Sequence, residues 1–303
     1  MKSMRIPLLI AWGVAIIGIV LGSFFDLQIS SAIASPTNGL GLTISAIGPT
    51  IGFAAVAAMG GGFIAFILKG QYHVALKVLF GVLALCCFGV SIYYPGGEYF
   101  GINGFYGAAP SWVGYLIVLL PEAAAGVGGY FLFKDAANKN SWMVFCIVIV
   151  LLCLALLAIL PPIKDAIRRP RFRILSVIGE DKFHNWWQAC PEYKQYMEQY
   201  GIESSDHFKS FPSGHTAEAS ILLVTSTFLP LADKKFAKYQ LPLFIASSVV
   251  VLLVAFARIL AAAHYLSDVS TGAFIIITLT LIANEVVMRV KPLQPQEEVP
   301  AEE

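Results

Sequence analysis

The chain has 303 residues, of which 57% are hydrophobic and only 13% are charged. Soluble domains average roughly 25% charged residues, so this composition, with a mean hydropathy of +0.74, excludes an ordinary soluble protein. It also excludes a disordered chain, which needs low hydrophobicity and high charge. The 20 Lys and Arg barely exceed the 19 Asp and Glu. This balance argues against a nucleic-acid partner, because there is no basic excess to neutralise phosphates.

Eight apolar runs are each long enough to cross a hydrocarbon core, which takes about 20 residues per helix. They cover residues 6–24, 46–68, 74–94, 112–133, 142–162, 215–232, 241–263 and 269–290. The sequence therefore predicts an all-α fold, a polytopic membrane helix bundle with about eight transmembrane helices. The first run also has features of a cleaved signal peptide, namely a basic start and a small-residue site at Ala32–Ala34. Because that site lies well past the end of a long apolar run, we expect a membrane anchor.

The distribution of Lys and Arg predicts the orientation of the bundle. The N-terminal segment and the connections at 69–77, 134–139 and 234–238 carry Lys or Arg, whereas 25–45 and 95–111 carry none. Basic connections favour the cytoplasmic side, so we expect a cell-membrane protein with both termini cytoplasmic. Residues 163–211 break the alternation, with eight Lys or Arg beside seven Asp or Glu. We interpret this segment as a folded extracytoplasmic insert.

Three polar clusters are predicted at the same outer face. The first follows the fifth run, where residues 164–173 hold five cations. A stretch of this kind commonly binds lipid headgroups at the cytoplasmic surface. Its predicted position outside argues against that role.

The second cluster, Phe211–Thr216, opens the sixth run. Ser213 is a strong helix N-cap, the free N–H groups of a helix N-terminus attract anions, and Gly214 lets a ligand approach closely. His215 then lies in the first turn, where it could donate a proton to a bound anion. An ordinary N-cap beside an interfacial His is an equally good interpretation of this hexapeptide.

The third cluster joins the seventh and eighth runs and contains Arg258, His264 and Asp268. Residues four apart on a helix face each other. Asp268 could therefore take one ring N–H of His264 and leave the other nitrogen as a nucleophile or base. Alternatively, Arg258 only snorkels to the interface and the His–Asp pair is a structural contact.

Together the clusters offer an anion cradle, two His and several cations on one face, which is what phosphoryl transfer requires. A metal is disfavoured, because the sequence has no H-E-x-x-H motif and one His is assigned to Asp268. We therefore expect a site with no metal and no cofactor.

In this order the clusters resemble the signature of the type 2 phosphatidic acid phosphatase superfamily. That signature is Lys-(six residues)-Arg-Pro, then Pro-Ser-Gly-His, then Ser-Arg-(five residues)-His-(three residues)-Asp. The second motif is intact at Pro212–His215, and the third matches except that Ala257 replaces Ser.

The first motif fits less closely than the other two. Lys164 and Arg171 have the required spacing, but Phe172 replaces the Pro. A competing alignment uses Arg169 and Pro170, which leaves no Lys at the required distance. We prefer Lys164 and Arg171 and keep Arg169 as the alternative.

The resemblance covers roughly residues 142–290 and implies a role for each matched residue. His264 attacks phosphorus to form a phosphohistidine, Asp268 orients it, and His215 protonates the leaving oxygen. The phosphoryl oxygens are held by Lys164, Arg171, Ser213, Gly214 and Arg258.

The expected organisation follows from the resemblance and the runs. Residues 1–73 form extra N-terminal spans, 74–291 a six-helix phosphatase core with the insert 172–211, and 292–303 a disordered tail. Aromatic residues at 183–200 in the insert predict either a lid on the membrane or simple packing on the bundle. Glu122 and Glu218 are carboxylates inside apolar runs, where ionisable groups are a functional hint.

The implied function is hydrolysis of a lipid phosphate or diphosphate among membrane lipids, of the undecaprenyl diphosphate, phosphatidylglycerol phosphate or phosphatidate type. No nucleic acid is expected, and the oligomeric state stays open. A soluble phosphomonoester is the alternative substrate. A transporter or a catalytically silent lipid-binding protein belongs to a different class; Glu122 is the feature that favours a transporter.

Overall fold

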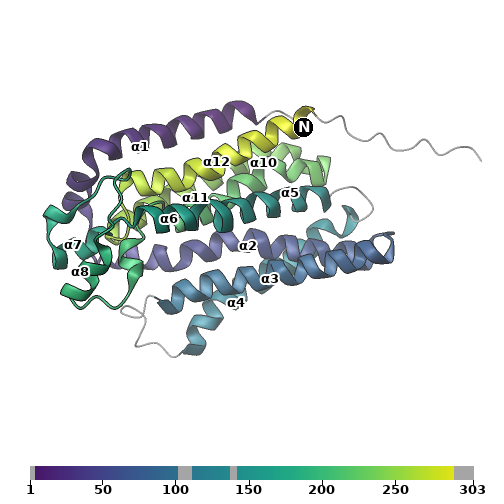
Figure 1. Cartoon of the computed structure of the whole chain (residues 1–303). Coiled ribbons are helices and arrows are strands. Elements are labelled where there is room, and N and C mark those ends of the chain that lie inside the picture. Colours follow the sequence, from purple (N-terminus) through teal and green to yellow (C-terminus); the bar gives the residue numbers. More distant parts are fainter. Residues whose placement is uncertain (1–3, 102–110, 137–141, 290–303) are drawn as a thin grey trace, which may run out of the picture.

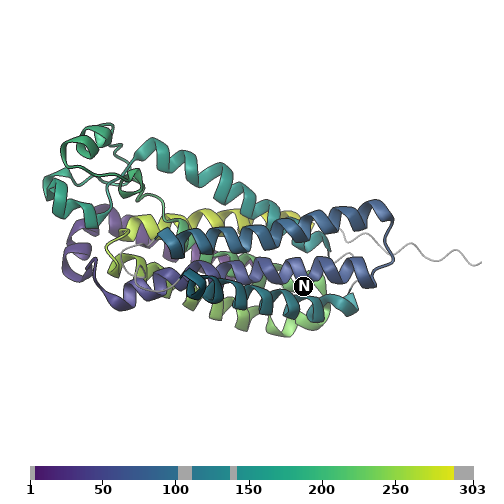
Figure 2. The same ribbon diagram turned by 90° about the horizontal axis from the view of Figure 1, so that it is seen from below.

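The computed structural model describes residues 4–101, 111–136 and 142–289, and every regular element within them is helical. Figures 1 and 2 show the long helices running lengthwise beside one another. In the described part of the chain, six helices are long and apolar enough to cross a membrane. The protein is therefore a helical membrane bundle. The predicted tail 292–303 lies outside the described residues.

The bundle is built from long helices in chain order. They are α1 (Arg5–Ile33), α2 (Gly39–Lys69), α3 (Val74–Gly101), α4 (Ser111–Phe133), α5 (Trp142–Cys153), α6 (Leu160–Ile167), α9 (Gly214–Ala219), α10 (Ile221–Ala232), α11 (Gln240–Leu260) and α12 (Leu266–Arg289). The insert adds α7 (Phe172–Ile178), α8 (Tyr193–Gln199) and the 3-10 turns η3 (Glu180–Lys182) and η4 (Ser205–Phe208).

The six candidate spans include α1, α2, α3 and α12, together with Phe145–Ile178 and Lys234–Leu260. The two other predicted runs are helical but are not among them: 112–133 corresponds to α4, and 215–232 is divided into α9 and α10. The expectation of one helix over 215–232 is wrong. The hydroxyl of Ser220, at the break, donates to the Thr216 carbonyl at 2.7 Å, and Ser side chains that bond back to the preceding turn disturb a helix.

The fifth run also departs from a regular helix. A π-helical segment, Leu154–Ile159, separates α5 from α6, which begins with Pro161 and Pro162 near its N-terminus. Proline lacks the N–H that the preceding carbonyls need, so the turn before it widens. The helix then ends at a left-handed Arg168, with φ of 52°. Lys164 is therefore helical, whereas Arg169 and Arg171 follow the turn.

The two ends of the bundle differ. Arg5 and Glu285 form an ion pair of 3.6 Å, which brings the start of α1 beside the end of α12. In Figure 1 the N-terminus and the end of α12 lie at one end of the bundle, and α7 and α8 lie at the other. The termini and the insert are thus at opposite ends.

The N-terminal helices are packed into the same bundle as the rest. A Cβ on Gly22 of α1 would lie 2.5 Å from the backbone nitrogen of Ser267, and one on Gly61 of α2 would lie 1.8 Å from the carbonyl oxygen of Gly126 in α4. Only glycine permits backbones to approach so closely. The domain division at residue 73 stays a prediction.

The interior and the surface of the bundle are both apolar. The largest buried cluster is aromatic and includes Phe63, Phe66, Phe80 and Phe145, whose rings stack or meet edge to face. Large apolar side chains also point outward, as at Leu85, which is 74% exposed. An exposed apolar surface of this extent fits contact with lipid.

The insert has a small core of its own on top of the bundle. Ile174, Leu175 and Phe208 pack there with Tyr265 of the bundle. Trp186 donates to the hydroxyl of Ser23 in α1 at 2.9 Å. The packing interpretation of the insert aromatics therefore holds for these contacts, and a lid role stays a prediction.

Candidate active site

His264 lies in the short connection between α11 and α12 and is buried. Its Nδ1 is 2.7 Å from the carbonyl oxygen of Ser210 and 3.6 Å from a carboxylate oxygen of Asp268. Because a carbonyl only accepts hydrogen bonds, Nδ1 carries the proton and Nε2 keeps its lone pair. The closest acceptor is thus Ser210, which the sequence did not indicate, with Asp268 next to it.

Asp268 approaches His264 through a capping arrangement and not through one helical turn. The helix α12 begins only at Leu266, so the predicted helical pairing of His264 and Asp268 is wrong. Asp268 instead lies in the first turn, where its Oδ2 accepts the backbone N–H of Tyr265 at 2.9 Å and the hydroxyl of Ser210. A side chain in the first turn that reaches back to the preceding N–H is a capping box.

The other oxygen of Asp268 is bound by Arg169, which is fully buried. Arg169 Nη1 lies 2.6 Å from Asp268, and its Nη2 lies 2.9 Å from Asp26 of α1. Its Nε donates to the carbonyl oxygen of His184 in the insert at 2.8 Å. Buried charges must be paired in this way. Arg169 therefore joins the insert, α1 and α12, and both of its carboxylate partners are accounted for.

The preferred first-motif residues lie in a different setting. Arg171 binds Asp206 of η4 through the backbone oxygen at 2.9 Å and the carboxylate at 2.7 Å. Lys164 donates to the Lys209 carbonyl at 3.2 Å. Burial raises the pKa of Asp206, but the charges of Arg171, Lys164 and Arg173 outweigh it and hold that pKa below its usual range.

Ser213 is confirmed as the N-cap of α9, since its side chain accepts the N–H of Thr216 at 3.4 Å. Its own N–H donates to the Asp268 carbonyl at 2.9 Å, which fastens the second motif to the third. His215 follows and is buried. Beside Gly214 there is open space: a Cβ there would meet only Glu218 Oε1, at 3.6 Å.

The three motifs converge on one place. The charges of Arg258, Arg171 and Lys164 act on His215, and His264 also acts on it. Arg258 and Arg171 act in turn on His264. Arg258 is buried at the end of α11, where its carbonyl accepts the N–H of His264 at 3.2 Å. Two imidazoles and three cations thus surround the end of the bundle next to the insert.

The electrostatics keep His264 neutral. Burial lowers its pKa well below the usual value for histidine, and the positive charge of Arg258 adds to that effect, while Asp268 opposes it. A neutral imidazole with a free Nε2 is the form that a nucleophile requires.

The two departures from the family signature occupy packed positions. Ala257 is fully buried where α11 meets α2, with its carbonyl 3.1 Å from the position of a Cβ on Gly41. Phe172 packs edge to face on Tyr265 at 6.2 Å between ring centroids.

The two flagged carboxylates are separated by the fold. Glu218 is buried in α9, and its charge acts on Lys164. Glu122 is buried in α4 and lines a cavity of about 630 Å³ formed by α2, α3 and α4, which none of the predicted site residues lines. Glu218 therefore belongs to the candidate site, whereas Glu122 does not.

Sequence reasoning missed Asp26 and Ser210. Asp26 is the sole acidic residue in the first 97 residues and comes directly after an apolar run, which is a usable signal for a buried partner. Ser210 acts on His264 through its backbone carbonyl, which every residue possesses, so no sequence signal marks it.

Comparisons with known proteins agree with this arrangement. Residues 142–291 match the model of the PAP2 superfamily. That segment contains all three motifs and most of the bundle end that carries the site. Searches of curated proteins and of solved structures returned no match. The chain belongs to the PAP2 superfamily, the type 2 phosphatidic acid phosphatases, and its function is of the phosphatase type, the hydrolysis of a phosphoric ester.

Proposed function

We propose that the protein hydrolyses a lipid phosphate or diphosphate at the extracytoplasmic surface of the membrane through a phosphohistidine intermediate. The observation that carries the proposal is the 2.7 Å contact between His264 Nδ1 and the Ser210 carbonyl. It directs the ring proton to Nδ1 and leaves Nε2 as the attacking atom.

In the first step, the lone pair of His264 Nε2 attacks phosphorus and the bond from phosphorus to the lipid oxygen breaks. His215 donates its proton to that oxygen, so the lipid alcohol or monophosphate leaves in neutral-equivalent form. The negative charge of a bound phosphoryl group favours the protonated form of His215 that this step needs. Asp268 stabilises the positive charge that develops on His264.

In the second step, water attacks the phosphorus of phosphohistidine and the P–N bond breaks. His215, now neutral, takes the proton from water, and inorganic phosphate is released with both His in their starting forms. The three cations Lys164, Arg171 and Arg258, with Ser213 and the Gly214 amide, are assigned to the phosphoryl oxygens, where charge develops. No step in this scheme requires a metal.

A lipid substrate is supported by an apolar cavity of about 640 Å³ between α1, α11 and α12. Its lining begins beside the site at Thr216 and Ser270 and extends along the helices to Pro7 and Leu241. A substrate with a polar head and a long hydrocarbon tail fits this combination, because the head reaches the imidazoles while the tail stays among apolar side chains. A soluble phosphomonoester would leave this lining unused, which makes it the second candidate.

Phosphate release by the purified protein tests the proposal. The panel contains phosphatidate, phosphatidylglycerol phosphate, undecaprenyl diphosphate and soluble sugar phosphates, each with wild-type protein and His264→Ala. We expect release from at least one lipid phosphate and none with His264→Ala. Faster turnover of the soluble phosphates would replace the lipid proposal with the second candidate, and activity retained by His264→Ala would reject His264 as nucleophile.

A further inference from the structure

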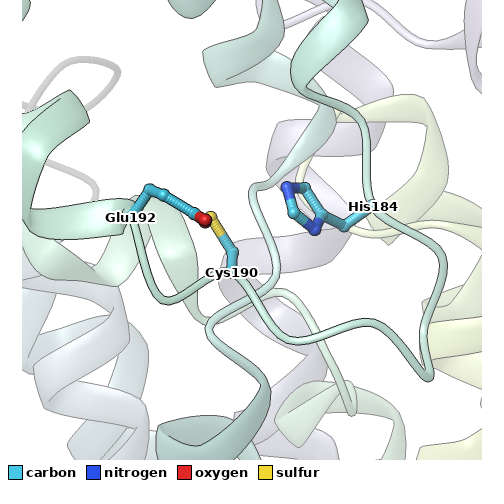
Figure 3. Close-up of side chains that lie close together, drawn as sticks. All are labelled: His184, Cys190 and Glu192. Carbon is cyan, nitrogen blue, oxygen red and sulfur yellow. The ribbon is translucent and has the colours of Figure 1, made fainter.

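The insert holds a second chemically distinctive cluster, away from the two imidazoles of the site. His184, Cys190 and Glu192 lie in the segment between η3 and α8, and each offers one atom that can bind a metal. These three atoms all lie within 4.8 Å of one another. Figure 3 shows the Glu192 carboxylate against the Cys190 sulfur, with the His184 imidazole on the facing strand of the same loop.

The surroundings of the cluster prepare two of these groups for a metal. The ring of His184 donates one N–H to the Ala189 carbonyl, which leaves the other nitrogen available. The backbone N–H of Glu192 donates to the Cys190 sulfur, a contact that favours the thiolate. Hydrogen bonds of this kind from neighbouring backbone groups accompany most metal-binding His residues.

The charges of the cluster call for a cation. Cys190 is fully buried beside Glu192, and burial together with the Glu192 charge raises the pKa of its thiol to about 11. Two acidic groups side by side are unfavourable unless a cation lies between them. Among the described residues, Glu192 forms no ion pair that would supply one. A bound metal displaces the thiol proton and removes this conflict.

We propose that His184, Cys190 and Glu192 bind a divalent ion of the zinc type. One imidazole nitrogen, one thiolate and one carboxylate oxygen are ligands that zinc takes in its four-coordinate sites. On binding, the Cys190 proton passes to solvent and the fourth position is filled by water. Glu192 is exposed, so the ion can enter from solvent.

The ion has a structural consequence close to the active site. Cys190 donates its N–H to the Ile167 carbonyl at 2.9 Å, and the His184 carbonyl accepts from Arg169 at 2.8 Å. Joining His184 to Cys190 through a metal therefore fastens the loop that holds Arg169, and Arg169 in turn binds Asp268. The ion takes no part in the transfer of the phosphoryl group.

Metal binding by the full-length protein in detergent, purified without a polyhistidine tag, tests this proposal. We expect one Zn²⁺ per chain by elemental analysis after dialysis against Zn²⁺, and a sulfur-to-metal charge-transfer absorption with Co²⁺ as the spectroscopic probe. Cys190→Ser should abolish that absorption and weaken Zn²⁺ binding by about tenfold or more. Zn²⁺ should raise the Tm of the wild-type protein and leave that of Cys190→Ser unchanged.

Two matched controls separate this cluster from other ligands. His207→Ala removes a second His of the insert, and Cys153→Ser removes an exposed Cys of the bundle; both should retain the absorption and the Zn²⁺ stoichiometry. Glu192→Gln alters an exposed side chain and should fold normally while binding Zn²⁺ more weakly. Equal binding by wild-type, Cys190→Ser and Glu192→Gln would overturn the proposal, as would the absence of the Co²⁺ absorption in the wild-type protein.

Discussion

His264 depends on a backbone carbonyl for its tautomer and on a carboxylate for its charge. Ser210 accepts the Nδ1 proton at 2.7 Å, whereas Asp268, at 3.6 Å, is also bound to Arg169 at 2.6 Å. The carboxylate is therefore held in place before any substrate arrives. Such preorganisation is how an enzyme stabilises a charge that exists only during reaction.

The lowered pKa of His264 predicts the acid side of the pH profile. Since burial lowers the pKa from the ordinary value of about 6.5, the nucleophile stays unprotonated as the pH falls through that value. We expect kcat/KM, corrected for the separately titrated ionisation of the substrate, to decline only well below pH 6.5. A corrected profile that declines with an apparent pKa at or above 6.5 would contradict the assigned environment of His264.

The two candidate first-motif arginines should behave differently when replaced. Arg171→Ala removes a cation that acts on both imidazoles. We expect it to lower kcat/KM by about 10- to 100-fold, which corresponds to charge-assisted hydrogen bonds of about 1.5–3 kcal/mol.

Arg169→Ala leaves Asp26 and Asp268 buried without their common partner. Breaking a buried pair costs about 3–5 kcal/mol, so we expect a loss of folded protein in detergent, measured by size-exclusion chromatography and thermal unfolding. A stable Arg169→Ala protein with normal kcat, beside an inactive, unfolded Arg171→Ala, would reverse these two roles.

At the scale of elements, α1 is a support for the active site. Gly22 lets it approach Ser267 closely, and Asp26 there accepts from the Ser267 backbone at 2.9 Å and binds Arg169. We expect Asp26→Asn to lower kcat by roughly 10- to 100-fold with little change in KM, because a small displacement of catalytic groups has effects of this size. Ser23→Ala, on the same helix turn but bonded to Trp186, serves as the control and should keep near-normal kcat. Equal kcat for wild-type and Asp26→Asn would remove α1 from the account.

The cavity between α1, α11 and α12 makes a prediction about substrate chain length. Ala255→Phe adds bulk to a residue that lines the cavity, whereas Leu253→Phe changes an exposed residue of the same helix outside it. Ala255→Phe should raise KM for long-chain lipid phosphates and leave short-chain analogues unaffected, with Leu253→Phe unchanged for both. Equal effects of Ala255→Phe on long and short chains would show that the cavity does not hold the tail.

The sequence predicted those parts of the site that are carried by side chains with unusual chemistry in apolar surroundings. His215, His264 and Arg258 stand out because ionisable groups at span ends are costly. Arg169 and Arg171 could not be told apart, since their roles depend on which carboxylate each one meets in space. The break at Ser220 was missed because a hydroxyl that bonds to its own helix leaves no mark on hydrophobic periodicity.

At the scale of the whole molecule, the insert and the termini lie at opposite ends of the bundle, and the pattern of Lys and Arg predicts that the insert is outside. Cysteines placed at exposed Lys194 of α8 and exposed Lys238 near the start of α11 test this orientation. We expect a membrane-impermeant maleimide to label Lys194→Cys in intact cells and Lys238→Cys only after lysis. The reverse pattern would place the active site on the cytoplasmic face.

The central claim is that His264 carries the phosphoryl group during turnover, and trapping that group tests it most directly. The purified protein is mixed with a radiolabelled lipid phosphate, quenched in alkali within milliseconds to seconds, and digested for mass spectrometry, since phosphohistidine survives alkali but not acid. The account predicts phosphate on His264 in the wild-type protein, less of it in His215→Ala, and none in His264→Ala. Phosphate found on another residue, or phosphate release with no phosphoprotein at any time, would contradict it.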